Sequence, residues 1–178
     1  MGLEDPPEPA FSSTPASDLD RVRQLVDLAE GRAEDEGSVP LLDEAGIDAV
    51  LRRTRRIALI GASARPYRPS HGVMATLLRA GYEVVPVSPR ETEVLGQRCY
   101  PDLVAATEAT GPFDLVDVFR NAAACPQHAR EAVDAGARCL WLQLGIVSWE
   151  AARIAHAAGI PVVMDRCTAI ELGRMRRA

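Results

Sequence analysis

The chain contains no lysine, since all 20 of its basic side chains are arginines. This absence excludes catalysis through a lysine Schiff base and the lysine of a P-loop nucleotide site. Cysteine is also sparse: the four cysteines form no Cys-x-x-Cys pair and have no histidine at ligand spacing. We therefore expect neither a metal site nor a disulfide framework.

Long apolar runs are missing as well, because no stretch approaches the roughly 18 uninterrupted apolar residues of a membrane-spanning helix. The amino terminus is rich in acid and proline, where a secretory leader has a basic and then an apolar region. Cysteines without a disulfide framework fit a reducing compartment. The sequence thus predicts a cytoplasmic protein that binds no membrane.

Charge is distributed unevenly along the chain, behind a formal net charge of −5. Residues 1–50 hold 13 acids and 3 arginines, whereas residues 51–178 hold 12 acids and 17 arginines. The mildly basic second part suits a small anionic ligand. Its excess charge is too small, and the 4% of aromatic residues too few, to indicate nucleic-acid binding.

The composition also divides the chain into two parts. Residues 1–17 are rich in proline, serine and acid and predict a disordered segment, while 18–30 has the apolar spacing of a helix. We expect residues 1–40 to form an acidic extension, partly disordered with a short helix, and 41–178 to form one globular domain. The acidic arm is a candidate for binding a protein partner.

Apolar segments in the second part alternate between strand-like and helix-like patterns. The expected strands are 57–61, 83–87, 115–119, 139–142 and 161–164. The expected helices are 41–53, 70–80, 102–106, 126–135, 148–159 and 168–175. Three of these helices are followed by a glycine and then a strand, which is typical of βαβ units. The pattern therefore predicts an α/β fold with a doubly wound parallel sheet of about five strands, whose ligands bind at the carboxyl ends of the strands.

The first strand ends in a loop that favours phosphate binding. Gly61 directly follows four consecutive apolar residues, and a basic turn with Arg65 and Arg68 leads into the next helix. Backbone N–H groups at such a helix start attract anions, and a glycine lets a ligand approach the backbone closely. The dinucleotide fingerprint is absent, because its second and third glycine positions hold Ser63 and Pro66.

The end of the second strand narrows the ligand class. Dinucleotide sites place an acid here for the ribose hydroxyls, but this chain has Ser88, Pro89 and Arg90. A ligand with both a pyrophosphate and a ribose phosphate fits best. NADP and coenzyme A both qualify, and the missing fingerprint counts against NADP.

Six ordered motifs resemble a known family. They are the segments 61–63, 68–70, 81–89, 117–120, 140–145 and 163–167. Together they resemble the small stand-alone CoA-binding proteins, which are similar to the nucleotide-binding domain of the succinyl-CoA synthetase alpha subunit. The resemblance covers about residues 45–173 and implies a Rossmann-like domain with coenzyme A lying across the strand ends.

The resemblance also implies contacts for each part of coenzyme A. The first loop would hold the pyrophosphate, Pro89 and Arg90 would lie by the adenosine and its phosphate, and the end of the third strand would line the adenine side. The residues concerned are Gly61, Ala62, Ser63, Ala64, Arg68, Pro89, Arg90, Val118, Phe119 and Arg120.

No catalytic residue is expected. The synthetase's phosphorylated histidine lies in a second domain with no counterpart here. His71 lies at the start of the expected helix 70–80, and His128 and His156 lie within predicted helices with no carboxylate partner evident from the sequence. We therefore expect binding of coenzyme A or an acyl-CoA without turnover. The alternatives are an NADP-binding oxidoreductase or redox sensor, and a protein-interaction module with a vestigial pocket.

Three residues near the ends of the later strands keep two interpretations each. Trp141 is a core residue or a ligand contact, and Gln143 either satisfies a buried backbone group or touches a ligand. Cys167 is either an inert buried cysteine or a reactive thiol able to form a mixed disulfide with coenzyme A.

Overall fold

The structure is a computed structural model that describes residues 39–177. They belong to one compact unit, Gly37–Ala178. The expected disordered segment 1–17 and the expected helix 18–30 lie outside the described residues, so both stay predictions, as does the domain boundary at residue 41. Within the described part, no helix is long and apolar enough to cross a membrane.

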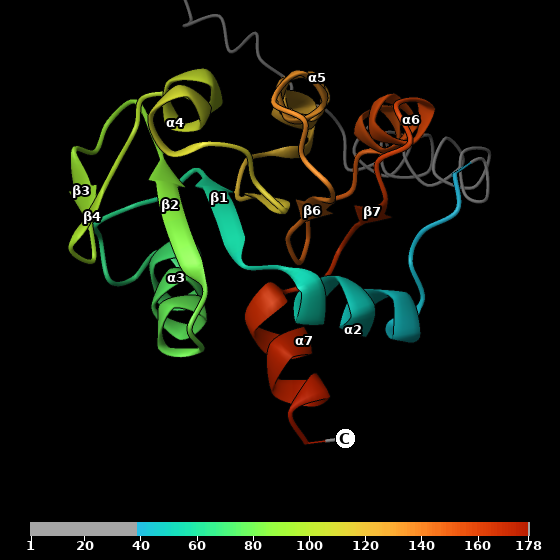
Figure 1. The fold of residues 1–178 in the computed structure, drawn as a ribbon, viewed down its shortest axis with the longest axis horizontal. Helices are drawn as coiled ribbons and strands as arrows, with labels where there is room; N and C mark the ends of the chain where they lie inside the picture. The colour runs from blue at the N-terminus through green and yellow to red at the C-terminus, as the bar shows by residue number, and fades with distance from the viewer. Residues whose placement is uncertain (1–38, 178) are drawn as a thin grey trace, which may run out of the picture. The chain divides into compact units, whose positions relative to one another are not determined.

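A five-stranded parallel sheet forms the centre of this unit (Figure 1). Its strands are β1 (Arg56–Ile60), β2 (Glu83–Val87), β5 (Leu115–Val118), β6 (Leu140–Leu142) and β7 (Val162–Val163), arranged in the order β2-β1-β5-β6-β7. The strand order runs outward in both directions from β1 and β5. The predicted doubly wound parallel sheet is therefore confirmed.

Helices cover both faces of the sheet (Figure 1). One layer holds α2 (Glu44–Arg53), α3 (Pro69–Arg79) and α7 (Thr168–Met175), and the other holds α4 (Leu103–Thr110), α5 (Cys125–Asp134) and α6 (Trp149–Ala157). A 3₁₀ turn, η1 (Ala122–Ala124), precedes α5. Each layer packs its own hydrophobic core onto the sheet. This arrangement explains why the central strands are apolar on both faces.

Local sequence signals set most helix boundaries. The side chains of Asp43, Asp102 and Ser148 each accept a hydrogen bond from a backbone N–H in the first turn of α2, α4 and α6. The glycines expected to end three helices, Gly81, Gly136 and Gly159, all have positive φ. Every predicted strand and helix of residues 41–178 has a counterpart.

The segment between β2 and β5 has more regular structure than the short helix over 102–106 that the sequence predicts. It contains a small antiparallel hairpin of β3 (Glu93–Val94) and β4 (Gln97–Arg98), and α4 extends to Thr110. The hairpin turns at Leu95 and Gly96, which both have positive φ. Strands of two residues are too short to show an alternating pattern in the sequence.

Candidate functional site

A cleft of about 930 Å³ opens at the carboxyl ends of the strands. Residues following β1, β2, β5 and β6, together with Cys167 after β7, line it. Its volume is within the range of small-molecule and cofactor sites. This is the edge of the sheet where the sequence places ligand binding.

Gly61 brings two of the cleft's loops into contact. Its N–H donates to the Val87 carbonyl at 2.9 Å, and its φ of +84° suits glycine. A β-carbon added at position 61 would lie only 2.6 Å from the Phe119 carbonyl oxygen. The sequence predicts close approach of a ligand here, whereas the close neighbour is the chain's own loop after β5.

The start of α3 forms one end of the cleft. Pro69 is the first helical residue, and no side chain caps the helix start. Ser70 is only 4% exposed and lines the cleft, yet its hydroxyl has no hydrogen-bond partner among residues 39–177. The positive end of the helix dipole and this unpaired hydroxyl both favour a bound anion.

A carboxylate of the chain already occupies part of this end. The Ala64 N–H donates to Glu91 Oε1 at 3.1 Å, and the Ser63 hydroxyl donates to the same oxygen at 3.4 Å. Ser63 Oγ in turn accepts from the Arg65 N–H at 3.3 Å. The loop after β1 is therefore arranged to bind an anionic oxygen.

Four arginines line the cleft, against the single acid Glu91. Two of them, Arg65 and Arg68, belong to the loop before α3, while Arg90 follows β2 and Arg120 follows β5. Within the described part of the chain, none of the four makes an ion pair with a carboxylate. The cleft thus carries net positive charge suited to a polyanionic ligand.

A buried polar cluster lies beneath the β6 end of the cleft. Asp117 is fully buried, and its carboxylate accepts from Gln143 Nε2 at 2.8 and 3.0 Å and from the Thr168 hydroxyl at 3.0 Å. Burial raises the pKa of Asp117 to about 7, although the hydrogen bonds from Gln143 and Thr168 act in the opposite direction. The cluster ties β5 and β6 to the first residue of α7.

The segment around Cys167 is held in place from several sides. The Trp141 indole N–H donates to the Arg166 carbonyl at 2.6 Å, and Asp165 Oδ1 accepts from the Gly145 N–H at 2.6 Å. Trp141 itself is fully buried, as expected for a core residue. Cys167 lies directly before α7 and is partly exposed to the cleft.

Most of the ten predicted site residues come together in this cleft. Those that line it are Gly61, Ala62, Ser63, Ala64, Arg68, Arg90, Phe119 and Arg120. Val118 is fully buried in the core against the α4–α6 layer, and Pro89 is exposed beside the cleft without lining it. For all ten, contact with a ligand stays a prediction.

Ser70 and Glu91 line the cleft but were not among the predicted site residues. Ser70 follows the first basic turn, and Glu91 follows Arg90. Gln143, the residue after β6 for which the sequence left two interpretations, donates to the side chains of Asp117 and Thr168 and also lines the cleft. Nothing local in the sequence indicates that Glu91 folds back onto the loop after β1.

None of the three histidines lines this cleft. The expectation that His128 has no carboxylate partner is wrong: its Nδ1 lies 2.8 Å from Glu131 Oε2. The pair has the i,i+3 spacing of neighbours on one helix face, so the sequence of the predicted helix already contained this signal. In the described range 39–177, no three His, Cys, Asp or Glu side chains gather in a way that could hold a metal ion.

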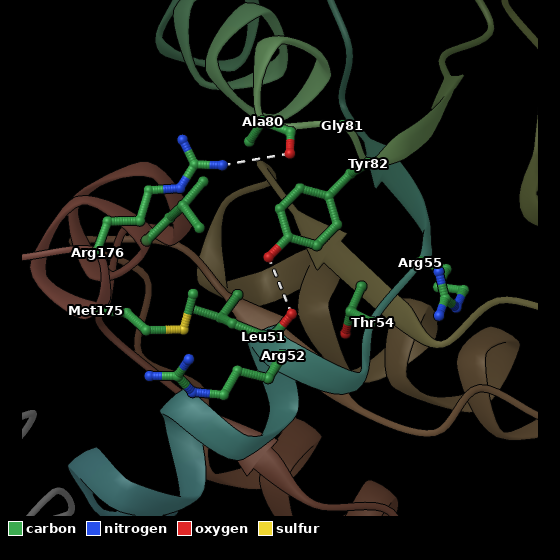
Figure 2. A pocket seen from close by; sticks show the side chains of 10 residues that line it. Leu51, Arg52, Thr54, Arg55, Ala80, Gly81, Tyr82, Met175 and Arg176 are labelled. Atoms are coloured by element: carbon green, nitrogen blue, oxygen red, sulfur yellow. Dashed lines mark hydrogen bonds between the residues drawn. The ribbon is translucent and has the colours of Figure 1, made fainter.

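A second, smaller pocket of about 230 Å³ lies at the opposite edge of the sheet, beside the amino ends of β1 and β2. Figure 2 shows the side chains that line it. The Tyr82 hydroxyl donates to the Leu51 carbonyl at 2.9 Å, and the Arg176 guanidinium donates to the Ala80 carbonyl at 3.3 Å. These bonds join α2, α3 and α7. The pocket is smaller than typical cofactor sites and is part of the packing between these helices.

Comparisons with known proteins agree with this geometry. A family model described as "CoA binding domain" matches residues 55–173. The uncharacterized protein YneT of Bacillus subtilis (strain 168) is 40% identical over 124 residues, which cover 70% of this chain and 90% of YneT. Among solved structures, Prb, the PH1109 protein redesigned for binding, is 36% identical with a TM-score of 0.72, covering 77% of this chain and 94% of its own. The cell-free ID.343 protein from Thermus thermophilus is 35% identical with a TM-score of 0.70, and the match covers 75% of this chain and 99% of the Thermus chain.

The backbone contact at Gly61 yields a stability prediction. Gly61→Ala should lower the free energy of unfolding by about 2–4 kcal/mol, because strain at positive φ adds to the clash with Phe119. Gly159→Ala is the matched control: φ is +77° there, but a β-carbon meets no atom within 4 Å. It should cost only about 1 kcal/mol. If urea unfolding shows the same loss of unfolding free energy for both variants, the close contact between Gly61 and Phe119 does not contribute to stability.

The buried carboxyl yields a pH prediction. Because its folded pKa is raised from 3.8 to about 7, the folded chain keeps a proton between these pH values that the unfolded chain releases. Asp117 therefore makes the free energy of unfolding fall as the pH rises, by up to about 1.4 kcal/mol per pH unit. This fall ends above about pH 7, where the carboxyl is ionised in both states. Asp117→Asn removes this dependence.

Urea unfolding at several pH values between about 5 and 8 measures it. The stability of Asp117→Asn relative to the wild type should rise up to about pH 7 and then stay constant. Asp134→Asn, at an exposed position on α5, is the control and should show a constant difference. A constant difference for Asp117→Asn too would contradict the raised pKa.

Proposed function

The chain belongs to the CoA binding domain family, and from this premise we propose that it binds coenzyme A or an acyl-CoA in the strand-end cleft without turning it over. It would act as a carrier, a sensor or a regulatory partner. The observation that carries the proposal is the group of hydrogen-bond donors between the loop after β1 and the start of α3. There the Ser70 hydroxyl is accessible from the cleft and has no partner in the described residues, and the loop N–H of Ala64 already holds an anionic oxygen, that of Glu91.

The charges around this point fit the three phosphate groups of coenzyme A. Arg65 and Arg68 flank the loop after β1, where the pyrophosphate would lie. Arg90 lies at the β2 end, where a ribose phosphate would follow. Phe119 and Arg120 at the end of β5 would line the adenine side. An arginine binds phosphate oxygens through two parallel N–H bonds, so lysine is not needed.

The groups lining the cleft support binding without turnover. Its ionisable side chains are the four arginines, Glu91 and Cys167, and no histidine is among them. A general acid–base reaction requires a positioned acid and base with suitable pKa values, which arginine does not supply. The proposal includes a cytoplasmic location and a protein partner for the acidic extension 1–40.

Calorimetric titration of the full chain tests the function. We expect coenzyme A to bind, and dephospho-CoA to bind more weakly because it lacks the ribose phosphate. Arg68→Ala should weaken coenzyme A binding about tenfold, equivalent to about 1.4 kcal/mol. Arg79→Ala, on the last turn of the same helix and outside the cleft, is the matched control and should leave the Kd within about twofold.

The other outcomes of this titration decide between the alternatives. Preferential binding of NADP would replace the proposal with a redox function. Absence of binding by all three nucleotides would leave an interaction module with a vestigial pocket. An unchanged Kd for Arg68→Ala would remove the loop after β1 from the proposed site.

Glu91 yields a prediction of opposite sign. Its carboxylate competes with a phosphate for the Ala64 N–H, so Glu91→Gln should tighten coenzyme A binding about three- to tenfold at low salt. The gain should shrink as salt screens the charges. Glu93→Gln, at an exposed position on β3 outside the cleft, should change nothing. Weaker binding by Glu91→Gln would mean that Glu91 holds the ligand instead.

A further inference from the structure

Cys167 differs from the other cysteines of the chain. Cys99, Cys125 and Cys139 are buried, and burial raises the pKa of all three thiols, to about 11 for Cys125 and about 12 for Cys139. They are therefore poor nucleophiles. Cys167 alone among the four is partly exposed, and it lines the strand-end cleft.

The backbone on both sides of Cys167 is held by buried groups. Arg166 accepts a hydrogen bond from the Trp141 indole through its carbonyl, and its guanidinium lies 3.1 Å from Glu171 Oε1. On the other side, Thr168 is fully buried and donates to Asp117. The thiol is thus presented from a rigid segment, as a reacting group must be.

A second, independent feature beside Cys167 indicates a ligand. Gln143 is only 3% exposed, and its Nε2 donates to Asp117 and Thr168. Its Oε1 accepts no hydrogen bond from residues 39–177, yet it is not among the fully enclosed unpartnered atoms, so it faces the cleft that Gln143 lines. This oxygen is an unused acceptor for a ligand N–H group.

The order of the strands places these two groups at the end of the cleft opposite Arg90. In the sheet, β1 is the second strand from the β2 edge, and β7, which precedes Cys167, is the fifth. Three strand spacings separate them, about 14 Å. With the pyrophosphate at the β1 loop, the pantetheine arm of coenzyme A spans a distance of this order. Its amide N–H groups suit Gln143 Oε1, and its thiol end reaches Cys167.

We propose that Cys167 forms a mixed disulfide with coenzyme A. It does so by thiol–disulfide exchange with coenzyme A disulfide, the dimer of two coenzyme A molecules, bound in the cleft. The Cys167 thiolate attacks one sulfur of that disulfide. The new bond joins Cys167 Sγ to that sulfur, the original sulfur–sulfur bond breaks, and the second coenzyme A leaves as a thiolate that takes up the proton released by Cys167. One disulfide replaces another, so no further oxidant is needed. The inference rests on the proposed function, because the nucleotide must direct the arm to the thiol.

Intact-mass measurement of the full chain tests this step. Reduced protein, freed of reductant, is mixed with coenzyme A disulfide or with pantethine, which has the same reacting disulfide but no nucleotide. We expect one coenzyme A per chain, mapped to Cys167 and removed by dithiothreitol, formed at least about tenfold faster than the pantethine adduct. Acetyl-CoA, whose sulfur is blocked, should slow the reaction by competing for the cleft.

Two variants test the assignment to one residue. Cys167→Ser should abolish the adduct, and Cys99→Ser, outside the cleft, should retain it. Peptide mapping of the wild type gives the same information if a variant fails to fold. An adduct on another cysteine, or equal rates with both disulfides, would overturn the proposal. If calorimetry shows that coenzyme A binds but no adduct forms, the covalent step is wrong and the proposed function stands. If coenzyme A does not bind at all, the proposed function is wrong.

Discussion

The close approach of the Gly61 backbone to the Phe119 carbonyl is the contact on which the rest of the cleft depends. It joins the loop after β1 to the loop after β5, and these are adjacent inner strands of the sheet. Because these loops meet, the start of α3 and the side chain of Arg120 line one cavity. No other residue type fits this position without strain, since its φ is +84° and a β-carbon would clash with backbone.

The two ends of the cleft differ in their electrostatics. At the β1 loop, exposed arginines and the start of a helix produce positive potential, and Glu91 partly neutralises it. At the β6 end, the polar groups are buried and hydrogen-bonded to one another, and Asp117 carries the desolvation cost. The first end suits phosphates, whereas the second suits a neutral, amide-bearing chain. Coenzyme A combines both kinds of group in one molecule.

Strands and helices were largely predictable from the sequence. The five predicted strands agree with β1, β2, β5, β6 and β7 to within one or two residues, because buried parallel strands have continuous apolar runs and glycines end the helices between them. The hairpin of β3 and β4 was missed, since its strands have only two residues each. Val118, one of the predicted site residues, is buried in the core because side chains alternate along β5, and its contact with a ligand stays a prediction.

The sequence by itself determined the order of the elements, the edge of the sheet where the cleft opens, and the basic residues near that edge. These follow from local patterns and from the rule that parallel strands end together. Only the tertiary structure decided which side chains meet there. Ser63 and Glu91 are 28 positions apart, and Asp117 and Thr168 are 51 apart. Such contacts depend on the register and packing of separate elements, which no local pattern encodes.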